Sequence, residues 1–284
     1  MQPGDSGLSS AREGCYEREM KLTFLGTCSG TEPVPGRHHS SIALEHNGGV
    51  YWIDAGESCG YTAHLAGINL LATRAIFITH GHLDHIGGLP HLVWAIHKLD
   101  GLYGQVEGSE RPELSIPVRV PDLSIWEGVS KLLGAGLPGH RRFHFAAGEY
   151  GDGSVYEEDG LSVRARHNRH LGDPSPGEPW RSFSFRVEGG GKAIVFSGDL
   201  GHVSEIKPLL REPGGTDLFL METGHHKVEE VATWVTENEV KLGKLGFTHH
   251  GRAILADAGG ELRKARAILG DRVFIAEDGM TLEV

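Results

Sequence analysis

Four potential metal ligands stand within six consecutive residues, and this feature constrains the chain more than any other. His80, His82, Asp84 and His85 follow a short apolar run, typical of a buried strand, and precede a helical pattern. Imidazole and carboxylate are ligands that zinc accepts. His80 and His82 are expected to project from one side of an extended turn, and Asp84 and His85 to lie in the first helical turn. One short loop is therefore predicted to hold two ions, one with each pair.

Two complete ion sites need further ligands, and the second half of the chain offers candidates that each follow an apolar run. Asp199 is expected to bridge both ions with its carboxylate. His249 would complete the second ion, with His250 as the alternative. His170 would complete the first ion, with His167 as the alternative. The alternation of side chains along a strand does not choose between the last two.

Composition and charge restrict the partners. Of 284 residues, 39% are hydrophobic, and 38 acidic side chains outnumber 27 basic ones to give a net charge of −11. A small-molecule substrate is therefore favoured over a long nucleic acid, which a basic field would hold. Cys15, Cys28 and Cys59 form neither a disulfide framework nor a CxxC pair, which favours the reducing cytoplasm. The sequence indicates no membrane span or signal peptide and leaves open whether the chain forms a homodimer.

The hydrophobic pattern predicts layers of strands and helices. Asn47-Gly48 between two apolar runs predicts a hairpin turn. Strands are expected at 21–25, 41–44, 50–54, 75–79, 160–166, 182–187, 193–196, 218–221, 245–248, 273–276 and 280–284, the last two as a pair, and helices at 86–99, 228–235 and 261–269. This order predicts two packed sheets covered by helices, an α/β architecture. Residues 1–19 are expected to form a disordered tail, and residues 20–284 a single domain.

The segment 80–85, with the pattern HxHxDH, resembles the signature of the metallo-β-lactamase superfamily of binuclear metallohydrolases. The resemblance extends from about Lys21 to Met280 and implies the αβ/βα four-layer sandwich of that superfamily. Its order of later ligands falls on His170, Asp199 and His249. An asparagine two residues before His170 favours that residue over His167 as the ligand of the first ion.

The loop 25-LGTCSGTEP-33 and the strand end 53-IDAG-56 are similar to the ribonuclease Z and small phosphodiesterase branch of the superfamily. That branch carries a histidine directly before the glutamate found here at 222, but this chain has Met221. Members of the branch that process long tRNA substrates use an inserted arm, and the segment from Asp199 to His249 leaves no room for one. A small phosphodiester is therefore favoured over tRNA.

The chemistry implied by such a site is hydrolysis. Two ions that share a hydroxide lower the pKa of water to about 7 and stabilise negative charge in the transition state. Asp84 is expected to hold one ion and also to orient the water, while His225 or His226 would protonate the leaving group. Two divalent ions are expected, with zinc as the first choice and manganese or iron as alternatives.

Three functions are compatible with these residues. The first is a metal-dependent phosphodiesterase acting on a small phosphodiester or nucleotide. The second is a hydrolase of a carbonyl substrate such as a lactone, thioester or β-lactam, and the third is a non-hydrolytic di-metal redox or binding protein. Arg252, close after the His249 loop, and Trp180, at the end of a proline-rich loop, are candidate substrate contacts. Other arginines near the His170 segment offer positive charge: Arg164, Arg166, Arg169, Arg181 and Arg186.

Overall fold

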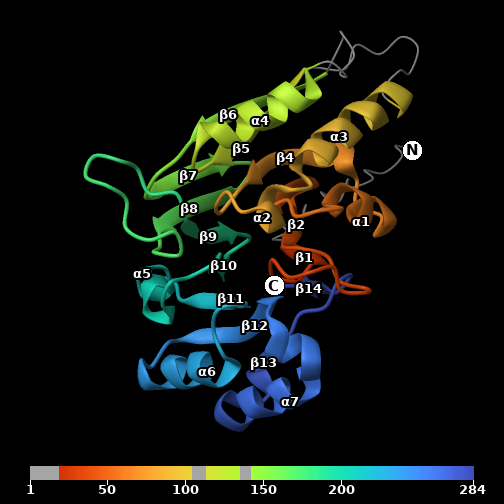
Figure 1. Cartoon of the computed structure of the whole chain (residues 1–284). Helices are drawn as coiled ribbons and strands as arrows, with labels where there is room; N and C mark the ends of the chain where they lie inside the picture. The colour runs from red at the N-terminus through yellow and green to blue at the C-terminus, as the bar shows by residue number, and fades with distance from the viewer. Residues whose placement is uncertain (1–18, 104–112, 135–141) are drawn as a thin grey trace, which may run out of the picture.

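Two seven-stranded sheets pack face to face in the computed structural model, which describes residues 19–103, 113–134 and 142–284 (Figure 1). The first sheet has the order β14 (Thr281–Glu283), β1 (Lys21–Gly26), β2 (Ser41–His46), β3 (Gly49–Ile53), β4 (Thr73–Phe77), β5 (Leu114–Val120) and β6 (Phe143–Glu149). The second has the order β13 (Val273–Ile275), β12 (Leu242–His250), β11 (Thr216–Thr223), β10 (Lys192–Phe196), β9 (Phe183–Gly189), β8 (Leu161–His167) and β7 (Gly153–Glu158).

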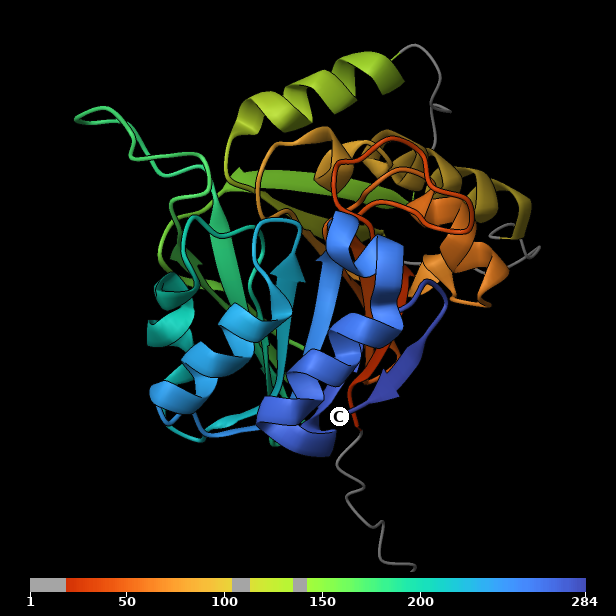
Figure 2. The same ribbon diagram turned by 60° about the horizontal axis from the view of Figure 1, so that its bottom comes forward.

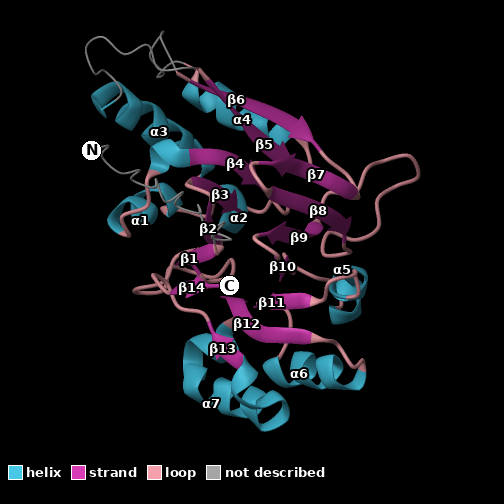
Figure 3. Ribbon diagram, turned by 180° about the vertical axis from the view of Figure 1, so that it is seen from behind, coloured by secondary structure: helices cyan, strands magenta, loops and turns pink. Residues whose placement is uncertain are grey.

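Helices form the two outer layers, which is clearest from behind (Figure 3). The first sheet is covered by α1 (Cys59–Leu65), α3 (Leu89–Tyr103) and α4 (Leu123–Leu133), with the short α2 (Leu83–Ile86) at its edge. The second is covered by α5 (Lys207–Leu210), α6 (Val228–Glu237) and α7 (Arg252–Leu269). Short 3-10 turns occupy Leu70–Ala72, Val203–Ile206 and Gly270–Arg272. The described residues thus confirm the expected four-layer α/β sandwich.

Alternation along the central strands explains the layers. Phe77 of β4 packs between the sheets, whereas its neighbour Ile76 packs under the helices. Phe196 and Val195 of β10 divide in the same way between the inner core and the opposite helical layer. Successive side chains of a strand point to opposite faces. The sequence of a strand that is covered on both faces is therefore an uninterrupted run of apolar residues.

The expected strands and helices are present, but the last two strands do not pair with each other. β13 pairs with β12 in the second sheet, while β14 pairs with β1 in the first. The chain crosses between the sheets at 276–280, where the Phe24 backbone exchanges hydrogen bonds with Met280 and Gly279. The Asn47-Gly48 hairpin between β2 and β3 is confirmed, and both turn residues have positive φ.

Several elements were not predicted from the sequence: α1, α4 and β5 to β7. β5 alternates between apolar and other residues, a strand signal that sequence reasoning missed, and it contains Pro117. β6 and β7 lie at the sheet edges, and most of their residues are not buried. The tail predicted at 1–19 lies, apart from its last residue, outside the described residues. The single-domain boundary stays a prediction. Within the ranges that the structure describes, no helix is long and apolar enough to cross a membrane.

Parallel pairing determines where polar side chains can gather. The strands β3 to β6 are mutually parallel, as are β10 to β13. Their carboxyl ends open on one edge of the sandwich, beside which the long loop between β8 and β9 projects (Figure 2). Ligand sites of α/β sheets form outside the carboxyl ends of strands, and the histidine-rich segments lie there.

Candidate metal centre

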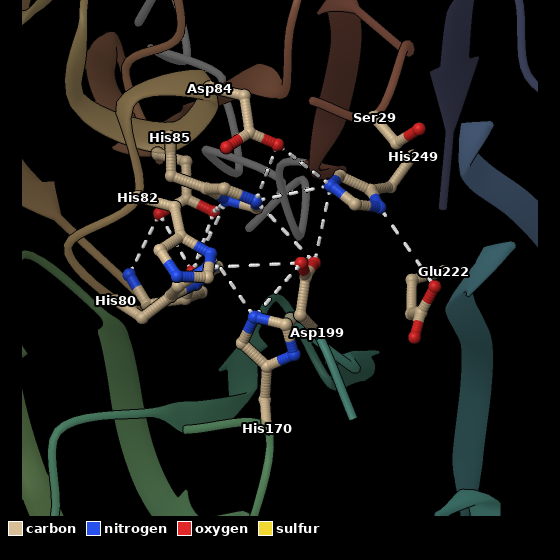
Figure 4. Close-up of polar contacts among 12 residues, drawn as sticks. Ser29, His80, His82, Asp84, His85, His170, Asp199, Glu222 and His249 are labelled. Atoms are coloured by element: carbon tan, nitrogen blue, oxygen red, sulfur yellow. Dashed lines mark hydrogen bonds and ion pairs between the residues drawn. The ribbon is translucent and has the colours of Figure 1, made fainter. Parts of the chain in front are cut away.

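Three overlapping groups of potential ligands converge at this edge (Figure 4). The first group consists of His80, His82, His170 and Asp199, and the second of Asp84, His85 and His249. The third joins Asp199 and His249 with His225. Within each group the ligand atoms lie within 4.8 Å of one another. The β4–α2 loop supplies His80 and His82, and α2 supplies Asp84 and His85. The connections after β8 and β10 and the end of β12 supply the other three predicted ligands. The structure therefore brings together all seven residues predicted as metal ligands.

In the first group the ring nitrogens converge at close range. His82 Nδ1 lies 3.1 Å from His80 Nε2 and 3.2 Å from His170 Nε2. Asp199 Oδ2 lies 3.8 Å from His80 Nε2 and 3.6 Å from His170 Nε2. Four donor atoms thus surround one point at the mouth of the site.

The second group repeats this arrangement around two buried histidines, His85 and His249. His249 Nε2 lies 3.2 Å from both His85 Nε2 and Asp84 Oδ2. Asp199 reaches this group with its other oxygen, Oδ1, which is 3.4 Å from both His85 Nε2 and His249 Nε2. The two carboxylate oxygens of Asp199 therefore face different groups.

The donor set fits divalent cations. Asp199 Oδ1 is buried and has no hydrogen-bond partner among the described residues, an arrangement that is costly unless a cation is near. Burial raises the pKa of Asp199, but the neighbouring His249 and His85 outweigh it and hold this pKa well below the ordinary value. Neutral imidazoles and carboxylates aimed at one point are the ligands of zinc, manganese and iron sites.

Two carboxylates that sequence reasoning did not assign orient predicted site residues, Asp54 a ligand and Glu222 a candidate acid. Asp54 Oδ2 lies 2.7 Å from His85 Nδ1, and Asp54 Oδ1 accepts a 2.7 Å hydrogen bond from the Thr79 backbone. Such a carboxylate fixes the tautomer of a histidine, so that its other nitrogen is free for a metal. Glu222 accepts hydrogen bonds from the His225 backbone at 2.9 Å and from its ring at 3.1 Å. Both carboxylates end buried strands, as Asp199 does, and this position was the available signal.

Glycine is required where loops approach the ligands. A Cβ at Gly30 would lie 3.0 Å from Asp84 Oδ2, and one at Gly224 would lie 2.7 Å from His249 Nδ1. The loop that carries His80 is anchored on the opposite sheet, because the Thr79 carbonyl accepts a 3.1 Å hydrogen bond from the Phe183 backbone. Contacts from both sheets therefore fix the site.

The competing histidines lie outside both groups. His250 Nε2 donates to the Ala276 carbonyl at 2.8 Å, and burial lowers the pKa of His250 to about 4, so the ring is neutral at pH 7. His249 has a positive φ of 49°, and this turn in the backbone sends the two neighbouring rings to different surroundings. His167 stacks on Trp180 at 4.0 Å and contacts Asp152 at 2.8 Å. The geometry thus separates His249 from His250 and His170 from His167.

The two candidate acids also differ in position. His225 Nδ1 lies 3.9 Å from Asp199 Oδ2, and its side chain is 44% exposed. The hydrogen bond that the His225 ring donates to the Glu222 carboxylate raises the pKa of His225. His226 is buried, with Nε2 3.2 Å from the Leu200 carbonyl. Only the first of these rings faces the predicted ligands.

The arginines named as candidate cations all have acidic partners. Arg252 forms a bidentate pair with Glu32 at 3.0 and 2.9 Å. The other pairs are Arg164–Glu212, Arg166–Asp152, Arg169–Asp173, Arg181–Asp122 and Arg186–Glu188. Trp180 has His167 against one side and the Arg169 guanidinium 5.8 Å from its ring centroid. Positive charge near the site is therefore largely neutralised.

Comparison with known proteins places this geometry in a family. The sequence model of the Anti-Pycsar protein Apyc1 family matches residues 20–222, more than half of the chain. The chain belongs to this family. Ribonuclease Z of Halobacterium salinarum is 28% identical over an alignment that covers 93% of this chain and 97% of that protein.

Solved structures show the same fold. The metallo-β-lactamase fold protein YhfI of Bacillus subtilis superposes with a TM-score of 0.70 at 17% identity, covering 94% of this chain and all of that one. The short form of human tRNase Z gives 0.65 at 22% identity, covering 92% and 98%. The predictions of superfamily, fold and enzyme class are confirmed: the chain is a metallohydrolase of the metallo-β-lactamase superfamily, on its ribonuclease Z branch.

Proposed function

We propose that the chain is a phosphodiesterase that uses two divalent ions, with zinc as the first choice, to hydrolyse a small phosphodiester or nucleotide. One observation carries the two-ion proposal: Asp199 directs one carboxylate oxygen at each ligand group. The ribonuclease Z relatives support phosphoester chemistry, because a ribonuclease cleaves a phosphodiester. His80, His82 and His170 would hold one ion, Asp84, His85 and His249 the other, and Asp199 both.

The residues of the chain would divide the remaining work. Ions held there supply a nucleophile at neutral pH and positive charge for the developing oxyanion. Asp84 directs Oδ2 at the second group and would use its other oxygen to orient the attacking water and accept its proton. His85, fixed by Asp54, keeps Nε2 aimed at the same point.

His225 is the better candidate for protonating the leaving group. Its ring is half exposed, lies beside Asp199 and is oriented by Glu222. A buried neighbour such as His226, engaged with the Leu200 carbonyl, would have to leave its packing to reach a substrate. His225 is therefore our candidate for the general acid in this chain, which has Met221 where the ribonuclease Z branch carries a histidine.

The charge of the protein favours a small substrate. The net charge is −11, and each arginine named near the site is paired with a carboxylate. A polyanion would gain little electrostatic attraction from such a surface, whereas a single phosphodiester needs only the charge of the centre. The roles of Arg252 and Trp180 as substrate contacts, a cytoplasmic location and a homodimer stay predictions.

Turnover of chemically distinct reporters tests the proposal. Metal-analysed protein is assayed with an aryl phosphodiester, a lactone and a β-lactam, and His82→Ala serves as the blank. We expect phosphodiester cleavage that requires metal and is lost in the blank. Cleavage of the lactone or β-lactam alone would replace the proposal with the carbonyl hydrolase, and no turnover with two ions bound would favour a binding protein.

A further inference from the structure

Leucines that directly follow two of the predicted ligands are unusually open to solvent. Leu83, between His82 and Asp84, is 77% exposed, and Leu171, after His170, is 43% exposed. Single exposed leucines are common and carry no meaning by themselves. These two differ because each is joined to a histidine of the first group, and those histidines are in contact at 3.2 Å.

The start of α4 adds a third apolar side chain at the same place. Ile125 lies against Gly81, since a Cβ on that glycine would be 3.3 Å from Ile125 Cδ1. The salt bridge of Arg181 with Asp122, at 3.0 Å, ties the end of the 171–180 loop to the beginning of α4. The His82–His170 contact, the Gly81–Ile125 approach and the Arg181–Asp122 pair place the segments that carry Leu83, Ile125 and Leu171 on the His82 side of the centre. Ile125 is partly buried against the helical layer, whereas the two leucines face solvent. We call these three residues the apolar rim.

Charge is balanced around the rim. Arg169 and Arg181, the cations beside it in the 168–182 loop, are paired with Asp173 and Asp122. Trp180 from the same loop is already stacked on His167. The rim therefore offers a substrate dispersion contacts and dehydration of apolar surface, next to a centre that attracts anions.

We propose that the apolar rim binds an apolar, ring-shaped ester group of the substrate while its phosphoryl group lies at the metal centre. The proposal rests on the proposed function for the anionic part of the substrate only. It assigns substrate selection to Leu83 and Leu171, neither of which contributes a polar atom. An aromatic ring is the group that gains most from such a contact, because it buries a large rigid area at low entropic cost.

Binding of two phosphonates tests this without turnover. Titration calorimetry on the zinc-loaded protein compares phenylphosphonate with methylphosphonate, which share the anion and differ in the ring. We expect phenylphosphonate to bind about tenfold more tightly, in line with the contribution of a buried apolar group. Leu83→Ser with Leu171→Ser should reduce this preference to about twofold or less.

Matched variants distinguish an effect of the apolar rim from the effect of removing any exposed leucine. Leu65→Ser removes a leucine that is 66% exposed on α1 and should leave the preference unchanged. If the double variant unfolds, the single variant Leu171→Ser takes its place, because Leu171 lies in a loop and its replacement should leave the fold intact. No preference in the wild type, no binding of either phosphonate, or an equal preference in the rim variants would overturn the proposal. A preference that the variants abolish, together with no cleavage of any phosphodiester, would uphold the rim and reject the phosphodiesterase.

Discussion

The two ligand groups share Asp199 but differ in their surroundings. In the second group His85 and His249 are buried, and His85 is backed by Asp54. In the first group His80 is buried as well, but His82 is exposed, and the exposed Leu83 follows it directly. A ligand fixed by a buried carboxylate holds an ion rigidly, whereas an open position can admit a substrate. From this comparison we expect the second group to retain an ion and the first group, through His82, to be open to a substrate.

Removing the shared ligand should have the largest effect. We expect Asp199→Ala to remain folded, to lose at least one ion and to lower kcat/KM by at least about 1000-fold, because the charge that both groups use disappears. Metal analysis, circular dichroism and reporter turnover measure the three quantities. Full activity in this variant would reject the two-ion assignment.

His225→Ala should distinguish an acid from a structural residue. We expect kcat for a phosphodiester with an alkoxide leaving group to fall by about 100-fold, and that for a p-nitrophenolate leaving group to change little, because that group leaves without a proton. His226→Gln is the matched control and should keep both rates. Equal losses with both leaving groups would show that His225 acts in another way.

Asp54→Asn should weaken ion binding by the second ligand group only. The amide keeps the size of the side chain but removes the charge that orients His85, and we expect the affinity for one ion to fall by about 10- to 100-fold. The other ion should bind as before. Stepwise metal titration resolves the two, and equal weakening of both would mean that the groups are not independent.

The smallest effect is expected at the exposed ion pair of Arg252 with Glu32. Glu32→Gln frees Arg252 from its exposed ion pair, and we expect the KM for a phosphodiester to fall by about twofold with an unchanged melting temperature, because exposed pairs contribute little to stability. An unchanged KM would remove Arg252 from the list of substrate contacts.

Some of this arrangement follows from local sequence. The HxHxDH pattern places four ligands by the geometry of a strand, a turn and one helical turn, and the apolar runs indicate strands covered on both faces. Asp199 could be named because it ends such a run. Asp54 and Glu222 also stand at the ends of strands. An acidic residue at a strand end, however, does not reveal which histidine ring its carboxylate will contact in the folded protein.

The sequence by itself determined the composition of the centre, the kind of layers around it and the superfamily. Only the tertiary structure shows how neighbouring residues are placed. A backbone turn at His249 separates its ring from that of His250, His226 is buried whereas His225 is half-exposed, and β13 and β14 belong to different sheets. The physical reason is the distance along the sequence over which each property is determined. Strand and helix periodicity depend on adjacent residues, whereas the direction of a ring toward a centre depends on contacts between segments more than a hundred residues apart.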